Sequence, residues 1–296
     1  MATRAAHEIV VDGVPVRVSS LDRVIYPNGF TKGDVIDYYR RVAPTLVPHL
    51  VGRPLTLKRY PEGVDGPFFY EKNCPRYKPE WVRTIDMPRV NGGVISYCSV
   101  SDAAGLVWLA NIGALELHPL LGRAPQPQCP TAIVFDLDPG PPAGLLDAAR
   151  VALRVREVLS EAGLTSLVKS SGKKGIHVWA PLAQNRSFDD TKRVARSLAQ
   201  SLERAFPNDI TSSMRKAERP GKTFIDWSQN DEHKSIVAPY SLRAAPTPTV
   251  SAPLRWSEVE QAVVDATPER LVFDPAAVLD RVARDGDLFA RALGHD

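Results

Sequence analysis

The chain has 296 residues, of which 44% are hydrophobic and 24% are charged, so it has enough apolar material for a sizeable core. Its net charge of only +3 excludes a protein with a globally basic surface, and any nucleic-acid-binding surface must be a local patch. No apolar run approaches the roughly 20 residues of a membrane span, and residues 1–11 lack the apolar segment of a signal peptide.

The three cysteines, Cys74, Cys98 and Cys129, are widely spaced. No Cys-x-x-Cys pair occurs, so we expect neither a zinc cluster nor a disulfide framework. This cysteine usage is typical of a reduced compartment, and we therefore expect a cytoplasmic protein.

The N-terminal half contains elements of both types. Thr31 and Asp34 have the spacing of a capping box, and apolar residues at helical spacing predict a helix from there to Leu50. We expect three further segments in this half: a strand over 94–100, a mostly apolar buried helix over 102–116, and a surface connection over 119–130.

The second half alternates strands with helices. A strand over 131–135 precedes the clearest helix, 145–159, which has one apolar and one charged face. The remaining expected elements are strands over 167–170 and 176–180, a helix over 190–206, a loop over 244–253, and short helices over 257–266 and 275–284. This irregular alternation favours a mixed α/β or α+β protein without giving its topology.

Two carboxylates follow the strand over 131–135. Asp136 and Asp138 are two residues apart and therefore point to the same face of a strand. Hard cations prefer carboxylate oxygens, and such a pair is suited to hold two divalent ions for phosphoryl or nucleotidyl transfer. Taken alone, the pair is more typical of a solvated strand end with two N-caps for the next helix.

A glycine-containing loop joins the strands over 167–170 and 176–180. Residues 170–177 read Ser-Ser-Gly-Lys-Lys-Gly-Ile-His, which combines flexible backbone, a hydroxyl and ammonium groups, as phosphate-binding loops do. The glycine spacing is too short for a Walker loop. Without its context, the segment is also consistent with a hairpin turn that carries solvated lysines and a packed His177.

A third carboxylate, Asp226, lies in the apolar run 223–227, so we expect it to be partly buried. A buried carboxylate needs a partner charge or a metal ion. A cation among the upstream residues could supply a plain ion pair; these are Arg215, Lys216, Arg219 and Lys222.

In this order, the three motifs resemble those of the archaeo-eukaryotic primase superfamily. The similarity is closest to the polymerase domain of the bacterial non-homologous end-joining ligase D and its stand-alone relatives, and it covers about residues 15–290. Matching segments outside the motifs are 21–27, 52–54, 58–61, 69–72, 226–230, 238–243 and 283–287.

The resemblance implies an α+β fold. A mixed β-sheet flanked by helices would form the primase-polymerase catalytic core, and the N-terminal half would add a mixed α/β subregion. The chain would be a single domain over 1–296, with an N-terminal subregion over about 1–125, the catalytic motifs over about 130–245 and C-terminal helices over about 255–292.

The resemblance also implies nucleotidyl transfer with two Mn²⁺ or Mg²⁺ ions and a ribo- or deoxynucleoside triphosphate as substrate. Asp136, Asp138 and Asp226 would be the catalytic metal ligands. The implied nucleotide-binding residues are Lys58, His118, Ser171, Lys174, Gly175, His177, Arg219, Gln229 and Arg243. Outside this resemblance, Arg219 would suit a surface ion pair. Lys173 is expected to face solvent or template.

Two further sets of residues are implied to contact DNA. Ser20, Arg23 and Lys32 match a pocket for the 5′-phosphate of a downstream strand, where an arginine fork suits phosphate. Phe69 and Tyr70 match an aromatic pair that stacks on template bases. The neighbouring Phe68 is instead expected to pack in the core.

Two classes of function agree with this pattern. One is a template-dependent nucleotidyltransferase that fills gaps and extends ends in double-strand break repair, with de novo priming as a variant. The other is a non-catalytic module that bridges DNA ends for a ligase. The intact acidic positions and the intact Ser-Gly-x-Lys-Gly-x-His motif favour the enzyme.

The expected partner is DNA with a gap or 3′ overhang and a 5′-phosphate, at the bacterial nucleoid and with no membrane involved. No Lys-x-Asp-Gly adenylation motif occurs in the sequence. We therefore expect an ATP-dependent DNA ligase to act in trans, and the resemblance implies Ku as a further partner in trans.

Overall fold

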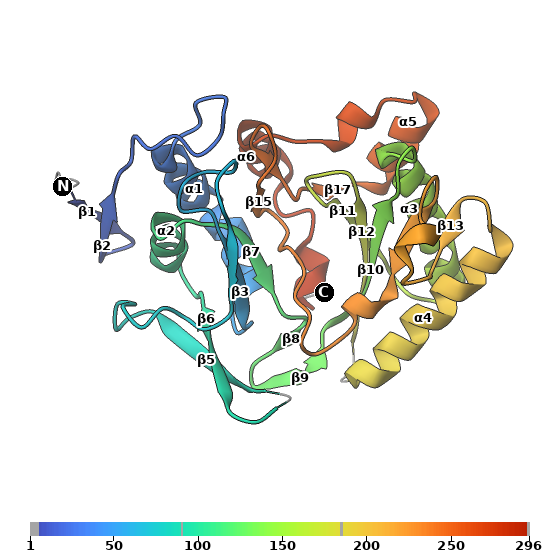
Figure 1. The fold of residues 1–296 in the computed structure, drawn as a ribbon, viewed down its shortest axis with the longest axis horizontal. Coiled ribbons are helices and arrows are strands. Elements are labelled where there is room, and N and C mark those ends of the chain that lie inside the picture. The colour runs from blue at the N-terminus through green and yellow to red at the C-terminus, as the bar shows by residue number, and fades with distance from the viewer. Residues whose placement is uncertain (1–5, 90, 184–185, 295–296) are drawn as a thin grey trace.

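Helix α1 (Lys32–Leu50) begins at the predicted capping box in the computed structural model, which describes residues 6–89, 91–183 and 186–294. The Thr31 hydroxyl accepts a hydrogen bond from the backbone N–H of Asp34, whose carboxylate accepts one from the N–H of Thr31. The apolar face of α1 packs against α2 (Ala103–Asn111). These two helices lie beside the sheet of the N-terminal half (Figure 1).

That first sheet is antiparallel, with the strand order β4-β3-β6-β5, and β7 also pairs with β3. It carries the aromatic residues predicted to stack on template bases, because these lie on its short edge strand β4. Its strands are β3 (Leu55–Arg59), β4 (Phe69–Glu71), β5 (Arg83–Pro88), β6 (Val94–Ser99) and β7 (Ala114–Pro119).

The second sheet is mixed, has six strands in the order β13-β14-β10-β12-β11-β17, and carries all three predicted motifs. Helices α3 (Leu145–Glu161) and α4 (Phe188–Ala205) cover one of its faces (Figure 1). Its strands are β10 (Ala132–Pro139), β11 (Leu167–Ser170), β12 (Ile176–Pro181), β13 (Ile210–Thr211), β14 (Thr223–Asp226) and β17 (Pro253–Leu254). The α+β architecture expected from the sequence is confirmed.

The remaining elements connect the two halves or lie at their edges. Helix α6, near the C-terminus, packs against α1 of the N-terminal half. No helix in the described ranges has the length and apolar character needed to cross a membrane. These elements are β1 (Ala6–Val11), β2 (Val14–Ser19), β8 (Gly122–Arg123), β9 (Gln126–Pro130), β15 (Leu242–Arg243), β16 (Thr249–Val250), α5 (Trp256–Val264) and α6 (Pro275–Asp285).

The alternation of side chains along β10 separates two hydrophobic cores. Ile133, Phe135 and Leu137 are buried under α3 and α4 in one core. Ala132 and Val134 point to the opposite face, where they join the core of the N-terminal half. Because side chains alternate along a strand, Asp136 and Asp138 continue that second face. The two carboxylates are therefore turned toward the N-terminal half.

Asn230 completes the edge of β10 where its neighbour β14 stops. The pairing with β14 covers only residues 136–139 of β10. Beyond it, the Asn230 side chain accepts a hydrogen bond from the Val134 N–H at 2.9 Å and donates one to the Val134 carbonyl at 2.7 Å. The fully buried amide of Asn230 thus takes the place of a neighbouring strand.

The structure corrects the predictions for residues 102–130. The helix ends at Asn111 instead of residue 116, because Gly113 has a φ of +85° and the chain then pairs with β3 as strand β7. The expected surface connection over 119–130 contains the β8–β9 hairpin, and Leu120 and Leu121 within it are buried. Residues 114–117 are apolar except at position 116, and this run favoured a buried helix. A strand that is buried on both faces has the same apolar run, because both of its faces contact neighbours.

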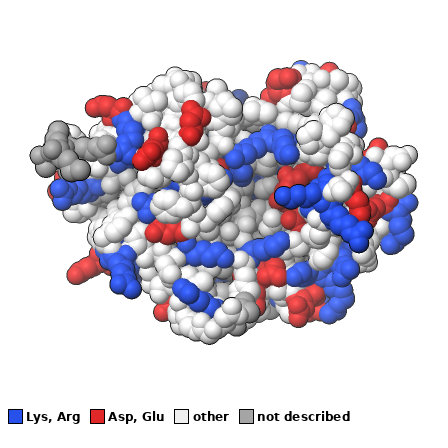
Figure 2. Space-filling view, in the orientation of Figure 1, with Lys and Arg blue, Asp and Glu red and all other residues white. Residues whose placement is uncertain are grey.

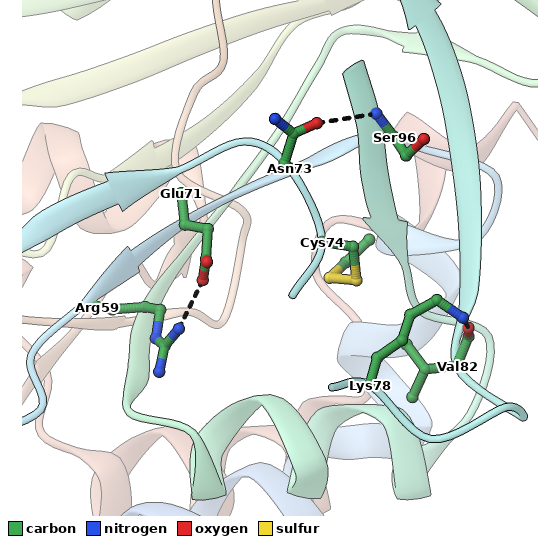
Figure 3. The surroundings of a disulfide bond; sticks show 8 residues. Arg59, Glu71, Asn73, Cys74, Lys78, Val82 and Ser96 are labelled. Atoms are coloured by element: carbon green, nitrogen blue, oxygen red, sulfur yellow. Dashed lines mark hydrogen bonds and ion pairs between the residues drawn. A yellow bond between two sulfur atoms is a disulfide. The ribbon is translucent and has the colours of Figure 1, made fainter. Parts of the chain in front are cut away.

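The expectation that disulfides are absent is wrong, because Cys74 and Cys98 form a disulfide bond (Figure 3). The segment after β4 runs beside β6, and the Cys74 N–H donates to the Ser96 carbonyl at 2.7 Å. The two cysteines are 24 residues apart in sequence, and only the folding of the first sheet brings them together. Cys129 is a free thiol.

We predict that one cysteine of the unfolded, unreduced protein reacts with iodoacetamide and that all three react after reduction. The first thiol would be Cys129, since the other two are oxidised. Mass spectrometry of the alkylated chain measures the number of labels. Three labels without reductant would contradict the disulfide.

We also predict that Asn230→Ala lowers the free energy of unfolding by about 2 kcal/mol or more, because the N–H and C=O of the buried Val134 lose their partner. Urea denaturation measures this change. The matched control is Asn28→Ala, which removes an exposed side chain that accepts one hydrogen bond, from the Phe30 N–H. The control should cost less than about 0.5 kcal/mol, and equal losses would contradict the role given to Asn230.

Candidate active site

Four polar side chains form a row across the second sheet. The strand register pairs Asp226 of β14 with Asp136 of β10, Asp136 with His177 of β12, and His177 with Lys169 of β11. Residues paired in this way share a face of the sheet. His177 Nε2 lies 3.2 Å from Asp136 Oδ1, and Lys169 Nζ lies 2.9 Å from His177 Nδ1. The carboxylates lie close to the C-terminal end of β10, which stops at Pro139, and the sequence had indicated a strand end there.

The predicted phosphate-binding loop is a tight turn between β11 and β12, next to this row. Ser171 Oγ accepts hydrogen bonds from the backbone N–H groups of Lys173 and Gly175. At Gly175, a Cβ atom would lie 2.6 Å from the Leu137 carbonyl oxygen, so only glycine allows this approach to β10. The loop is therefore held directly against the strand that carries Asp136 and Asp138.

An open cavity of about 420 Å³ lies between the loop, the carboxylates and the N-terminal half. It brings together residues that are distant in the sequence, from β4 to β15. Its lining consists of Tyr70, His118, Asp136, Asp138, Ser171, Lys173, Lys174, His177, Gln229, Lys234, Ser235, Ile236, Val237 and Arg243. In the space-filling view, Lys and Arg side chains lie on both sides of the central depression between the halves (Figure 2).

A buried glutamate of the N-terminal half pairs with cations from both halves at the cavity. Glu116 is 0% exposed, and its carboxylate lies 3.0 Å from His118 Nε2. It also lies 3.5 Å from both Lys173 and Arg243 and 3.9 Å from Lys58. Burial by itself would raise the pKa of Glu116. The hydrogen bond from His118 and the charges of Arg243 and Lys173 instead hold this pKa well below its usual range.

For Asp136 and Asp138, burial outweighs the nearby cations. Burial, together with the nearby charges of Asp136 and Asp226, raises the pKa of Asp138 to about 6. Burial also raises the pKa of Asp136. Two crowded carboxylates that resist joint ionisation are a favourable environment for a divalent cation, because the cation stabilises both negative charges.

The metal-ligating geometry is not preformed. Within the described residues, no three His, Cys, Asp or Glu side chains are gathered into a metal-binding group. The amide of Gln229 lies between Asp136 and Asp226 and donates to each at 3.4 Å. The all-oxygen donor set of the three aspartates nevertheless fits Mg²⁺ or Mn²⁺.

Three predicted nucleotide-binding residues lie outside the lining of this cavity in the described structure: Gly175, which packs against β10, Lys58 and Arg219. The guanidinium of Arg219 lies 3.6 Å from the centre of the Phe224 ring and donates to the Met214 carbonyl. Lys58 faces Glu116 and the Phe68 ring, whose centre is 4.1 Å from Nζ. Lys173, expected to face solvent or template, instead pairs with Glu116 and lines the cavity.

The residues predicted to bind a 5′-phosphate lie at a smaller pocket of about 60 Å³. Arg23 and Lys32 both line this pocket. Ser20 is three residues before Arg23 in the sequence, is not among the lining residues, and has a φ of +54°. Lys32 is buried and donates to the Ser19 carbonyl at 2.6 Å, and Arg23 donates to the Pro61 carbonyl.

Strand β4 carries the residues predicted to stack on template bases, and Tyr70 lines the large cavity. Phe69 and Tyr70 are 44% and 58% exposed, so both rings are accessible for stacking. Phe68, expected in the core, is 51% exposed, because its ring lies against Lys58 and Tyr60 at the surface.

Three charged residues of the site were missed by the sequence reasoning. Lys169 and Glu116 are fully buried, and Lys234 lines the cavity and donates to Ser228 Oγ. A signal existed for Glu116, because Glu116 and His118 are two residues apart and share one face of a strand. The prediction of a helix at this position hid that signal. Lys169 is preceded by apolar residues in a short strand, which is an unusual place for a lysine.

Residues 31–289 match the family described as LigD, primase-polymerase domain. The chain is 41% identical over 286 residues to the multifunctional non-homologous end joining DNA repair protein LigD of Mycobacterium tuberculosis, covering 93% of this chain and 37% of the relative. It is 33% identical over 273 residues to the bifunctional non-homologous end joining protein LigD of Bacillus subtilis, covering 92% and 43%. The chain thus spans less than half the length of these relatives.

The fold is likewise similar to a solved structure, the polymerase domain from Mycobacterium tuberculosis ligase D in complex with DNA. The TM-score is 0.87 at 39% sequence identity, and the match covers 94% of this chain and 97% of that one. On the family match over most of its length, the sequence identity and this fold, the chain belongs to the LigD primase-polymerase family.

Proposed function

We propose that this protein is a template-dependent nucleotidyltransferase that fills gaps and extends ends during non-homologous end joining. The observation that carries the proposal is the cavity in which Asp136 and Asp138 face a glycine-containing loop and a cluster of cations. A polyphosphate needs cations, and its transfer to a hydroxyl needs carboxylate-bound metal ions. Membership of the LigD primase-polymerase family supports the same reaction.

We propose that Asp136, Asp138 and Asp226 hold two Mn²⁺ or Mg²⁺ ions. When bound, these ions would make the attacking 3′-hydroxyl more acidic and neutralise the leaving pyrophosphate. The raised pKa values of Asp136 and Asp138 support this assignment, because a cation would relieve the repulsion between the two carboxylates. Gln229 would position the carboxylates of Asp136 and Asp226, since its amide contacts both.

The nucleoside triphosphate would lie in the cavity with its phosphates against the loop between β11 and β12. Ser171, Lys174, Gly175 and His177 would bind the phosphates. His118 and Gln229 line the same space, and Lys58 would add a charge next to it, beside Glu116. Arg219 and Arg243 would add charge: Arg243 lines the cavity, and the buried Nε of Arg219 has no hydrogen-bond partner among the described residues. Arg219 would have to turn away from Phe224 to reach the ligand.

On the DNA side, we propose that Ser20, Arg23 and Lys32 bind the 5′-phosphate of a downstream strand and that Phe69 and Tyr70 stack on template bases. The pocket lined by Arg23 and Lys32 and the exposure of both rings support these roles. A Ku protein and an ATP-dependent DNA ligase activity would act on the same DNA ends, at the bacterial chromosome in the cytoplasm. The chain would work as one unit, since one core contains residues of both halves.

We predict that Asp136→Ala and Asp138→Ala each reduce extension on a gapped duplex with Mn²⁺ to a few per cent of wild type or less, because the metal ions carry the chemistry. DNA affinity, measured by fluorescence anisotropy, should stay within about twofold, since it depends on basic and aromatic residues elsewhere. The control Asp37→Ala removes an exposed carboxylate of α1 and should extend normally. Substantial extension by either site variant, with ribo- or deoxynucleotides, would contradict the metal assignment.

We predict that the double variant Arg23→Ala, Lys32→Ala weakens binding to a gap with a 5′-phosphate and lowers the salt dependence of binding, because fewer phosphate charges are neutralised. Binding to the same gap without the phosphate should change little. The control Arg40→Ala, Arg41→Ala removes two exposed arginines of α1 and should not distinguish the two gaps. An equal loss of the site variant on both substrates would instead indicate a general basic surface.

A further inference from the structure

Lys169 is a buried lysine to which the proposed function gives no part. Its side chain lies on the carboxylate-bearing face of the second sheet and is 0% exposed. Nζ lies 2.9 Å from His177 Nδ1 and 2.5 Å from Ser251 Oγ. Both contacts are with uncharged oxygen or ring nitrogen atoms. A lysine that is buried in this way has a high desolvation cost, so its position calls for a physical reason.

The hydrogen-bond partners determine the direction of every bond in this row. The Ser251 hydroxyl donates to the Ser170 carbonyl at 2.9 Å, so its oxygen is left to accept from Lys169. His177 Nε2 faces Asp136 Oδ1, a hydrogen-bond acceptor, at 3.2 Å, and Nε2 therefore carries the proton. His177 Nδ1 is then unprotonated and accepts from Lys169 Nζ. An amine can donate to both partners whether or not it is charged.

We propose that Lys169 is a positioning residue, which anchors His177 through Nδ1 so that its Nε2–H points toward Asp136 and the nucleotide cavity. The anchored imidazole would donate a hydrogen bond without carrying a charge. It would also hold Asp136 Oδ1, while Oδ2 of the same carboxylate faces Gln229. The importance of this orientation for nucleotide binding rests on the proposed function, whereas the orientation itself does not.

The bond pattern is tested by NMR on the full chain with ¹⁵N-labelled histidine, without metal or nucleotide. In the assigned wild-type spectrum, His177 should carry its proton on Nε2, and its Nδ1 should show the shift of a ring nitrogen that accepts a hydrogen bond. In Lys169→Met, which is similar in length and apolar, the Nδ1 resonance should move toward the value of an unbonded ring nitrogen. The control Lys192→Met removes a lysine that pairs with Asp231 and should leave His177 unchanged.

A proton on Nδ1 in the wild-type chain would overturn the proposal, and this result needs no variant to fold. An unchanged Nδ1 resonance in Lys169→Met would overturn it as well. Ser251→Ala offers a milder perturbation of the same anchor and should shift the Nδ1 resonance in the same direction as Lys169→Met.

Primer extension on the gapped duplex with Mn²⁺ tests the consequence for the substrate. Lys169→Met should raise the KM for the nucleotide about tenfold, the effect of losing one well-placed hydrogen bond, and should change kcat less. An unchanged KM would overturn the positioning role. If the wild-type protein itself extends no primer, the proposed function fails, and the NMR result still decides the orientation of His177.

Discussion

The register of strand β10 between β14 and β12 is the constraint on which the rest of the site depends. It aligns Asp226, Asp136 and His177 in one row, and the pairing of β12 with β11 adds Lys169. Because successive side chains point to opposite faces, a slip of one residue would bury the carboxylates under α3 and α4 and expose Phe135 and Leu137. The burial of the apolar residues of β10 on one face therefore fixes the carboxylates on the other face. Asn230 bonds the part of the strand edge that β14 does not cover.

Carboxylates and cations both line the cavity. The carboxylates of the second sheet face a group of cations from both halves that pair with a single buried carboxylate, Glu116, of the N-terminal half. Each group is unfavourable by itself, since like charges repel in a partly buried environment. A nucleoside triphosphate with its divalent cations would compensate both, because its phosphates suit the cations and its metal ions suit the carboxylates. This complementarity is a physical reason for the open space between the halves.

The disulfide lies in the first sheet, where the segment after β4 runs along β6. It fixes the chain three residues beyond Glu71, which is paired with Arg59 of β3 at 2.7 Å (Figure 3). Both contacts hold β4 against the first sheet while its rings stay exposed. Aromatic rings can stack on bases only when the backbone that carries them is held in place, so this anchoring is consistent with the role proposed for Phe69 and Tyr70.

The sequence by itself determined the helices with strong periodicity and caps, such as α1, α3 and α4, because local hydrogen bonds and the spacing of apolar residues specify them. It also determined the three motifs, because their residue types are close together in the chain. Only the tertiary structure decided what depends on contacts between distant segments: that residues 114–119 are a strand, that Cys74 meets Cys98, and that Phe68 stays at the surface. The same holds for two buried charged residues. Glu116 has partners up to 128 residues away in the chain, and Lys169 has Ser251 and His177 as its partners. A buried charge is understood only through its partners, and those partners are set by the packing of strands that no local pattern specifies.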